Sequence, residues 1–302
     1  MIVRVGTRGS ALALAQTRLA TEQMDRIDLQ TQEVVIRTQG DRDPLQPTAT
    51  LGIGAFVKDL EAALLDGRID LAVHSAKDLP STPSPGLALA AFLPREDPRD
   101  VIVTRDGAGL AALRTGAVIG TESPRRRAFL LAARADVNIV SIRGNVDTRL
   151  RKVAAGELDA LLLAAAGLTR LGLRDRVSEW LDPAVMLPAV GQGAVVVQTR
   201  DDARELREQL DRIDHGATRA AIEAERAFLA ALGGGCQRPI AALGVCDGER
   251  LRLDGAVLDP DGARIVRDQI EGEAARPAAT GEELAAQLLA MGAHDLLFEV
   301  AS

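Results

Sequence analysis

The sequence has few aromatic residues and few of the side chains that usually bind metal ions. Its 302 residues include five phenylalanines, one tryptophan and no tyrosine, together with two cysteines and three histidines. So few aromatic rings argue against a protein that recognises ligands by base stacking or with an aromatic cage. Cys236, Cys246 and three scattered histidines make a poor set of zinc ligands, so we expect no metal site.

Lysine is also scarce, although arginine is plentiful. Lys58, Lys77 and Lys152 are the only lysines, and the formal net charge of the chain is −7. Because a phosphate backbone selects for a positive surface, we expect no binding to nucleic acid. The base composition of a genome can by itself favour arginine, so the positions of the arginines carry more information than their number.

Long apolar runs are missing as well. No stretch reaches the ~20 apolar residues that a membrane-spanning helix needs. The first ten residues, MIVRVGTRGS, lack the basic region, apolar core and cleavage site of a secretory signal. We therefore expect a cytoplasmic protein with no membrane partner, in which both cysteines remain reduced.

The first two-thirds of the chain do contain a regular alternation of short β-rich runs with helical patterns. Runs such as IDLAVHS (69–75) and NIVSI (138–142) are typical of strands. Alternation of this kind predicts βαβ units and a mostly parallel sheet in each of two lobes. Proline or glycine marks a change of pattern at 94–100 and 187–195, which indicates that the chain crosses between the lobes twice.

From about residue 217 the pattern changes to one long helix, alternating segments such as RLRLDGAVL (250–258) and a late helix at 281–291. This mixture predicts a third, smaller domain. The expected fold class is therefore α/β, with two lobes of mostly parallel sheet and a C-terminal α+β domain. The expected domains are 1–95 with 194–214 for the first, 99–191 for the second and 217–302 for the third.

Three predicted strand-to-helix turns each combine a helix cap with arginine. They are TRGS (7–10), TESPRRR (121–127) and IRGN (142–145), in which serine or asparagine is well placed as the cap. Arginine in a first helical turn opposes the helix dipole at a cost of roughly 0.3–1 kcal/mol, and a bound anion would reverse the sign of that cost. Because such turns leave the carboxyl ends of parallel strands, we expect all three at one crevice between the lobes.

The arginines of these turns predict a site for a small polyanion, since guanidinium groups fit carboxylates and phosphates in bidentate geometry. Arg149, one helical turn beyond the third cap, and Arg170 in GLTRLG would enlarge the cluster. A solvated surface is the alternative for any single arginine, but it accounts poorly for three equivalent turns. The candidate residues are Arg8, Ser10, Ser123, Arg125, Arg126, Arg143, Arg149 and Arg170.

A different turn, VHSAKDLPSTPSPG (73–86), introduces a carboxylate into this cationic crevice. Asp78 follows an apolar strand and precedes a proline-rich loop that cannot be helical. A carboxylate in such a place is suited to proton transfer or to stabilising a cationic intermediate. The alternatives for Asp78 are an ion pair with Lys77 and a turn-capping role. His74, on the preceding strand, is assigned no role.

The segment GGGCQRPI (233–240) follows the long helix and places Cys236 behind three glycines and near Arg238. It can be interpreted as a helix stop with a loose turn, or as a loop that presents a reactive thiol. A second loop, the long connection at 38–56, is of a length typical of a lid or of a disordered segment. Its GIG, like the GQG at 191–193, does not complete a dinucleotide-binding fingerprint.

A set of long and specific motifs runs in order through nearly the whole chain. They are TRGSALALAQT, FVKDLEAALLDGRIDLAVHSAKDLP, REDPRD, GTESPRRRAFL, SIRGNVDTRL, AAGLTRLGL, LPAVGQGA, AERAFL and GGGCQRPI. Together they resemble the porphobilinogen deaminase (hydroxymethylbilane synthase) family.

This resemblance implies a transferase of tetrapyrrole and heme biosynthesis. Such an enzyme deaminates its substrate, porphobilinogen, and adds four units stepwise to a dipyrromethane cofactor, then releases the linear tetrapyrrole hydroxymethylbilane by hydrolysis. The resemblance also implies a monomer of three domains, the first two similar to the lobes of periplasmic binding proteins. It further implies that Cys236 holds the cofactor, which is made from the substrate itself, through a thioether bond.

Several residues of the three turns match functional positions of the family. The resemblance implies that Asp78 is the catalytic aspartate, which assists deamination and stabilises the azafulvenium cation and the pyrrole nitrogens. It implies that Arg8, Ser10 and Arg170 bind the substrate. The residues that it assigns to the cofactor are Cys236, Lys77, Ser123, Arg125, Arg126, Arg143, Gly144 and Arg149.

Three positions depart from the family pattern. Ile53 stands where many members have lysine, Glu122 where small polar residues are common, and Pro124 where many members have leucine. The first change removes a cation from the predicted lid and leaves Lys58 to serve there. We expect Glu122 to weaken the local positive potential, whereas proline suits the first position of a helix.

Two functions from other classes remain open on the residues alone. An arginine-lined crevice between two α/β lobes would also suit a non-catalytic receptor for a carboxylated metabolite, although such a receptor has no use for the GGGCQ loop. A hydrolase with Cys236 as its nucleophile would need a histidine. No histidine is near Cys236 in the sequence, so His74 or His215 would have to approach it in space.

Overall fold

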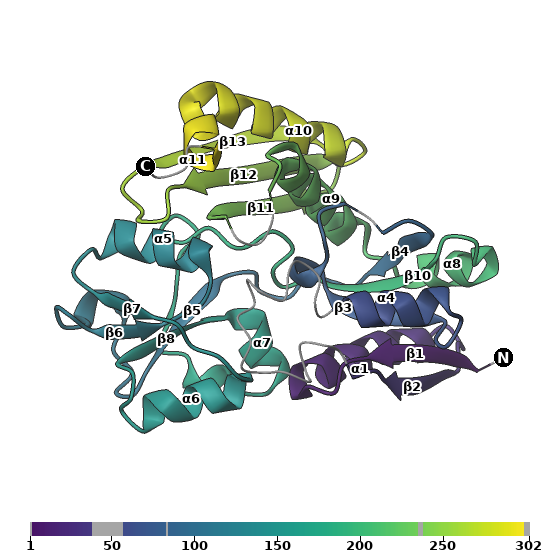
Figure 1. Cartoon of the computed structure of the whole chain (residues 1–302). Helices are drawn as coiled ribbons and strands as arrows, with labels where there is room; N and C mark the ends of the chain where they lie inside the picture. Colours follow the sequence, from purple (N-terminus) through teal and green to yellow (C-terminus); the bar gives the residue numbers. More distant parts are fainter. Residues whose placement is uncertain (1, 38–56, 83, 235–237, 299–302) are drawn as a thin grey trace.

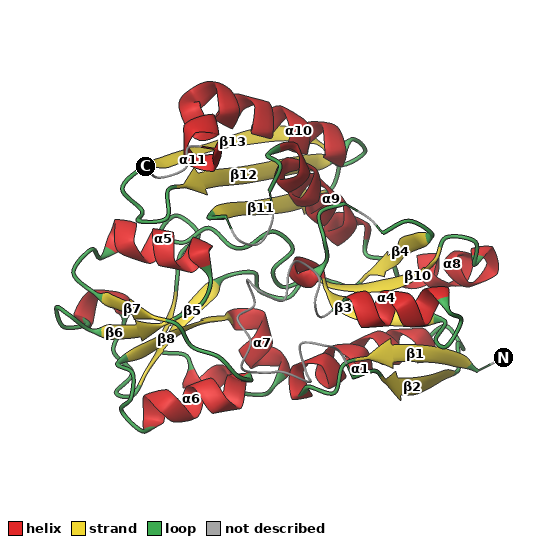
Figure 2. Cartoon of the chain, viewed as in Figure 1, coloured by secondary structure: helices red, strands yellow, loops and turns green. Residues whose placement is uncertain are grey.

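Two five-stranded sheets flanked by helices form two lobes, and a third domain packs against both of them (Figure 1, Figure 2). The computed structural model describes residues 2–37, 57–82, 84–234 and 238–298. The fold class expected from the alternating pattern is confirmed. No helix within these described residues is long and apolar enough to cross a membrane.

The first lobe combines four strands from the N-terminal part of the chain with one that returns from the second lobe. The strands are β1 (Val3–Thr7), β2 (Thr31–Val35), β3 (Leu71–Ser75), β4 (Leu87–Phe92) and β10 (Val195–Arg200), in the order β2-β1-β3-β10-β4. Packed on them are α1 (Ala11–Asp25), α4 (Lys58–Leu65), α8 (Arg204–Leu210) and the 3-10 helices Ala76–Asp78 and Asp211–Ile213. Alternate residues of the central strands, such as Val5, Leu71 and Val197, form the core of this lobe.

The second lobe repeats this plan within one continuous stretch of chain. Its strands are β5 (Asp100–Thr104), β6 (Val118–Gly120), β7 (Asn138–Val140), β8 (Ala160–Ala164) and β9 (Glu179–Trp180), in the order β7-β6-β8-β5-β9. Its helices are α5 (Pro124–Ala133), α6 (Val146–Ala154), α7 (Ala165–Arg170) and the 3-10 helices Leu110–Ala112 and Arg174–Arg176. Two apolar clusters, one on each face of the sheet, hold these helices in place.

Each sheet is mixed, because the strand in the fourth place of its spatial order runs antiparallel to both neighbouring strands. The reversed strands are β10 in the first lobe and β5 in the second, and each directly follows a crossing between the lobes. A strand that enters from the other lobe starts at the carboxyl edge of its sheet: Asp100 pairs with Ala164 at the end of β8, and Val195 pairs with Ser75 at the end of β3. The two carboxyl edges therefore face each other across the crossings.

The third domain is an antiparallel sheet with two helices on one face. Its elements are α9 (Gly216–Ala231), β11 (Ile240–Asp247), β12 (Arg250–Leu258), β13 (Ile265–Glu273), α10 (Pro277–Leu288), the π-helical turn Leu289–Ala293 and α11 (His294–Phe298). Phe228 of α9 and Leu284 of α10 meet over Gly255, where a Cβ atom would contact both side chains. The opposite face of the sheet packs on Phe129 of α5, so the third domain is joined to the second lobe by an apolar core.

Candidate active site

A cavity of about 310 Å³ lies between the carboxyl edges of the two sheets. Its wall takes residues from the ends of β1, β3 and β8, from the starts of α1 and α6, and from the second crossing. The polar residues of the wall are Arg8, Ser10, Gln16, Ser75, Lys77, Asp78, Arg126, Asn145, Asp147, Arg149 and Arg170. The crevice expected from the three turns is therefore present, and five of its seven charged residues are cations. Asn145, which was expected to cap α6, makes no side-chain capping hydrogen bond among the described residues.

The first lobe contributes the turn from β1 into α1. Ser10 caps α1, since its Oγ accepts a hydrogen bond from the backbone N–H of Ala13 at 3.2 Å. Arg8 precedes this cap and lies in the cavity wall. Gln16, one turn further along α1, donates to Ser75 Oγ at 3.4 Å and so fixes the helix against the end of β3.

The turn that follows β3 carries Lys77 and Asp78 into the same wall. The backbone N–H of Ala76 donates to Ala194 in the second crossing, which anchors the turn. Asp78 is exposed, whereas Lys77 is partly buried and donates from Nζ to Gln192 Oε1 at 3.4 Å. Burial, followed by repulsion from Arg126, lowers the pKa of Lys77 to about 8. Among the described residues no ion pair joins Lys77 to Asp78, so that alternative for Asp78 is not supported.

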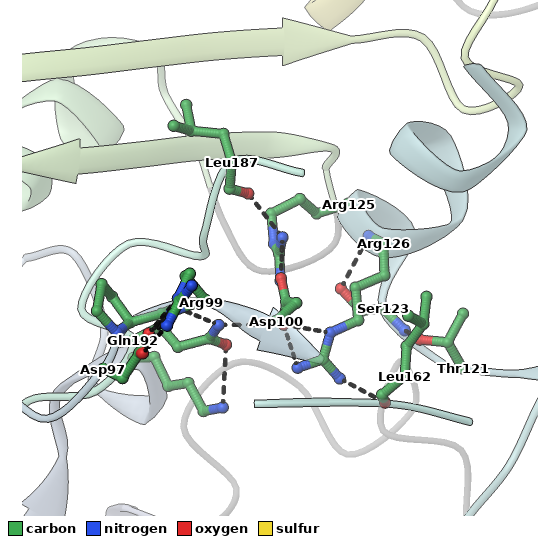
Figure 3. A network of polar contacts seen from close by, with 12 residues as sticks. Asp97, Arg99, Asp100, Thr121, Ser123, Arg125, Arg126, Leu162, Leu187 and Gln192 are labelled. Carbon is green, nitrogen blue, oxygen red and sulfur yellow. Dashed lines mark hydrogen bonds and ion pairs between the residues drawn. The ribbon is translucent and has the colours of Figure 1, made fainter. Parts of the chain in front are cut away.

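The second lobe contributes two consecutive arginines from the first turn of α5 (Figure 3). Ser123 caps this helix and accepts from the backbone N–H of Arg126 at 3.4 Å. Both guanidinium groups turn inward to Asp100, with N–O distances of 2.7 Å from Arg125 Nη1 and 2.7 Å from Arg126 Nη2. Arg125 also donates to Leu187 O at 2.7 Å. Arg126 reaches the cavity wall, whereas Arg125 lies behind it.

Sequence reasoning missed Asp100, which is fully buried at the start of β5. Burial alone would raise the pKa of this carboxyl, but the charges of Arg125 and Arg126 outweigh that effect and hold the pKa well below its usual range. Asp100 thus provides a negative charge inside the protein for Arg125 and Arg126, whose positive charges were expected to bind the anionic ligand. The only available signal was an aspartate at the head of the apolar run VIVT.

The remaining arginines are held by the backbone or by a nearby carboxylate. Arg143 forms an ion pair with Glu122 at 2.7 Å, so the departure at Glu122 supplies a partner for this arginine. Arg149 donates from Nε to the carbonyl of Gly144, whose φ of +99° suits only glycine. Arg170 donates from Nη2 to the carbonyl of Gly193 at 2.6 Å, which joins α7 to the second crossing. Burial lowers the pKa of both Arg149 and Arg170.

Most of the predicted site residues therefore meet at one cavity, and the others fall into two groups. Ser123, Arg125 and Arg143 are not part of the described wall, although each contacts or neighbours a residue that is. Cys236 and Ile53, with the predicted lid at 38–56, lie outside the described residues.

Neither histidine that was considered as a partner for a cysteine nucleophile is free for that purpose. His74 is buried, with Nε2 at 2.9 Å from Gln198 Oε1, and burial lowers its pKa to about 4. His215 caps α9, where its Nδ1 accepts from the backbone N–H of Thr218. Within the described part of the chain, no three His, Cys, Asp or Glu side chains are grouped so that they could hold a metal ion.

Comparison with known proteins identifies the family. The model named porphobilinogen deaminase, dipyromethane cofactor binding domain, matches residues 3–208, and the model of the porphobilinogen deaminase C-terminal domain matches residues 219–290. The chain belongs to the porphobilinogen deaminase family. It is 49% identical to the porphobilinogen deaminase of Desulforudis audaxviator, over 99% of this chain and 97% of the relative. It is 47% identical to that of Nitratidesulfovibrio vulgaris, over 98% and 96%.

Among solved structures, the periplasmic VFT2 domain of Bordetella pertussis BvgS matches 70% of this chain and 86% of its own length. The sequence identity is 17% and the TM-score is 0.44, which is too low to establish more than a loose resemblance.

Membership of the porphobilinogen deaminase family settles the class of activity. The chain is a transferase of tetrapyrrole biosynthesis, which deaminates porphobilinogen and joins four units on a dipyrromethane primer to give hydroxymethylbilane. The wall of the cavity fits a dipyrromethane that bears acetate and propionate groups, because Arg8, Lys77, Arg126, Arg149 and Arg170 line it. In addition, Nε of Arg170 is buried and has no hydrogen-bond partner among the described residues, which leaves a donor for a carboxylate.

Proposed function

We propose that Asp78 is the catalytic carboxylate of this porphobilinogen deaminase and that Cys236 carries the dipyrromethane through a thioether bond. The observation that supports Asp78 most directly is its place in the 3-10 turn after β3, in the wall of the main cavity and also of a smaller adjoining one. The second carboxylate of the main wall, Asp147, lies in the first turn of α6 and borders only the larger cavity.

The role of Asp78 follows from the chemistry of deamination. Loss of ammonia from the substrate leaves a cation, and a carboxylate held beside it stabilises that charge. In its protonated form the same group can transfer a proton to the departing amine, and in its ionised form it can accept hydrogen bonds from pyrrole N–H groups. Arg126, Lys77 and Arg149 carry positive charge, so they cannot stabilise a cation and instead suit the carboxylates of the ligand.

The bound dipyrromethane would supply the free pyrrole carbon to which the first unit is joined. We assign Lys77, Ser123, Arg125, Arg126, Arg143, Gly144 and Arg149 to its binding, and Arg8, Ser10 and Arg170 to binding of porphobilinogen. Among the residues of the wall, Arg8 and Ser10 come from the first lobe and Arg126, Gly144 and Arg149 from the second, which supports this division, whereas Lys77 and Arg170 come from the first and the second lobe respectively.

Three further assignments are part of the proposal. The domains run over 1–95 with 194–214, over 99–191 and over 217–302. A monomer is favoured because one chain supplies both sides of the cavity. A cytoplasmic location agrees with the biosynthetic role shared with the bacterial relatives.

The test is the Asp78→Asn variant, assayed for ammonia release from porphobilinogen and for intact mass. We expect turnover to fall by roughly 10²–10⁴-fold, the usual contribution of a positioned acid–base group, while the added mass of one dipyrromethane is retained. Asp147→Asn is the matched control and should keep most of its turnover. The Cys236→Ser variant lacks the proposed attachment point, so its intact mass should be that of the chain without the cofactor. The Cys246→Ser variant should keep the added mass. An active Asp78→Asn variant would return Asp78 to a structural role.

A further inference from the structure

The buried carboxylate Asp100 touches neither the cavity nor solvent, yet it contacts the side chains that shape the cavity. Its Oδ1 accepts from Arg126 Nε at 2.9 Å, and its Oδ2 faces Arg125 Nη1 at 2.7 Å. Oδ1 also accepts from Gln192 Nε2 at 3.0 Å. One carboxylate thus joins two consecutive arginines of α5 to the second crossing (Figure 3).

The two arginines need an anion to lie where they do. Both arginines are buried. Apart from Asp100, the partners of their side chains among the described residues are neutral: the carbonyl of Leu187 for Arg125 and the carbonyl of Leu162 for Arg126. Two adjacent guanidinium groups repel each other more strongly when water is removed from around them. The negative charge of Asp100 opposes that repulsion, and its two oxygens give each arginine a separate position.

Gln192 carries the arrangement across to the first lobe. Its Nε2 donates to Asp100 Oδ1 and to Pro98 O at 2.7 Å, while its Oε1 accepts from Lys77 Nζ at 3.4 Å. Only one orientation of the amide satisfies both the carboxylate and the amine. A continuous set of hydrogen bonds therefore runs from Asp100 through Gln192 to the residue beside Asp78.

We propose that Asp100 is a positioning residue for the reaction. It fixes Arg126 in the cavity wall and Arg125 behind that wall. Through Gln192 it also sets the position of Lys77, and of the turn that carries Asp78, relative to these two arginines. This inference rests on the proposed function and adds a residue that acts only through others. Because one anion serves three cations, Arg125, Arg126 and Lys77, the group as a whole stays positive and keeps its attraction for a polycarboxylate ligand.

The charge of Asp100 should be detectable at Lys77. Burial lowers the pKa of Lys77, and the negative charges of Asp78 and Asp100 act in the opposite direction while those of Arg126 and Arg125 add to the lowering. Removal of the Asp100 charge should therefore make Lys77 lose its proton at a lower pH. A role of Asp100 in packing alone predicts no such change.

The experiment compares the wild-type holoenzyme with Asp100→Asn, which keeps the shape of the side chain. With only three lysines, reductive methylation with ¹³C-formaldehyde gives few side-chain signals, and Lys77→Arg identifies the one from Lys77. We expect the Lys77 midpoint to move to lower pH in Asp100→Asn while Lys58 and Lys152 do not move. We also expect kcat/KM for porphobilinogen to fall on the order of 100-fold, as for other displacements of about 1 Å in an active site.

A second variant, Gln192→Leu, keeps the tests decisive if Asp100→Asn does not fold. It cuts the bridge to Lys77 but leaves the Asp100–arginine contacts, so it should change the Lys77 midpoint and lower kcat/KM. An unchanged Lys77 midpoint and unchanged kcat/KM in a folded variant would overturn the proposal. The titration responds to the Asp100 charge and to the Gln192 bridge whether or not Asp78 takes part in the chemistry, so it decides this inference even if Asp78 proves not to be catalytic.

Discussion

Two buried carboxylates, Asp100 and Glu225, each join segments of the chain that are far apart in sequence, but their partners differ. Glu225 of α9 accepts from Arg95 at 2.6 Å and from the backbone N–H groups of Gly191 and Gly244 at 2.6 and 2.7 Å. Asp100 accepts from side chains only, and one of these, Arg126, reaches the cavity wall. Glu225 contacts Arg95 of the first crossing and Gly191 of the second, whereas Asp100 lies at the end of the first crossing and contacts Gln192 of the second. The crossings therefore face the third domain on one side and the cavity on the other.

This difference separates a structural carboxylate from one that serves the site. The partners of Glu225 are backbone groups and one arginine, which together hold α9 and β11 against the two crossings. The partners of Asp100 are side chains, and one of them, Arg126, lies in the cavity wall. Loss of Glu225 should therefore appear mainly as lost stability, whereas loss of Asp100 should appear in catalysis and in the titration of Lys77.

The largest effect is expected from Glu225→Ala. The change leaves Arg95 as a buried charge without its partner and two backbone N–H groups without acceptors. Removal of one member of a buried ion pair costs about 3–5 kcal/mol, so the midpoint of thermal unfolding should fall clearly.

The matched control is Glu223→Ala, two residues earlier on the same helix. Glu223 is partly exposed and pairs with Arg219 at 3.4 Å, an interaction worth only about 0.3–0.5 kcal/mol. Equal midpoints for the two variants would mean that Glu225 does not hold the domains together. Among the molecules that fold, Glu225→Ala should still carry the mass of the cofactor.

A smaller effect is expected where the second crossing passes beneath the turn that carries Asp78. Gly191 has a φ of +75°, and a Cβ atom there would lie 2.8 Å from Lys77 N and 2.9 Å from Ala76 C. These are backbone atoms of the turn that carries Asp78, so Gly191→Ala should displace that turn as well as strain its own backbone.

Gly172→Ala is the control, because Gly172 has a similar φ of +69° with nothing within 4 Å of the added atom. Its cost should be the backbone strain alone, about 1–2 kcal/mol. Gly191→Ala should lose about 1–3 kcal/mol more and, unlike the control, should lower kcat with porphobilinogen. If both variants keep full activity, the position of the turn does not depend on this crossing.

The parts of the site that depend on local sequence could be predicted, and those that depend on distant pairing could not. Ser10 and Ser123 cap their helices as expected, because a cap is formed with residues two or three positions away. The cationic wall could be predicted because turns at the carboxyl edges of two facing sheets must meet.

The roles of Asp100 and Glu225 could not be foreseen from their neighbours in the chain. Asp100 is separated from Gln192 by 92 residues, and Glu225 from Arg95 by 130. In REDPRD and AERAFL both look like ordinary surface charges. The reversed strands β5 and β10 were missed for a related reason, since their direction is set by where the crossings enter each sheet.

The smallest of the expected effects is a pH dependence of kcat/KM that arises from Lys77, which Gln192 links to Asp100. The pKa of Lys77 is lowered to about 8, so its amine is charged below that pH and loses its charge as the pH rises through it. Under the proposed binding of a ligand carboxylate by this charged amine, kcat/KM should decline above pH 8, at most about tenfold per pH unit. Lys77→Arg keeps its charge at all these pH values and should lack the decline, whereas Glu225→Gln, on the other carboxylate, should retain it. A decline that persists in Lys77→Arg would assign the pH dependence to another group and remove Lys77 from ligand binding.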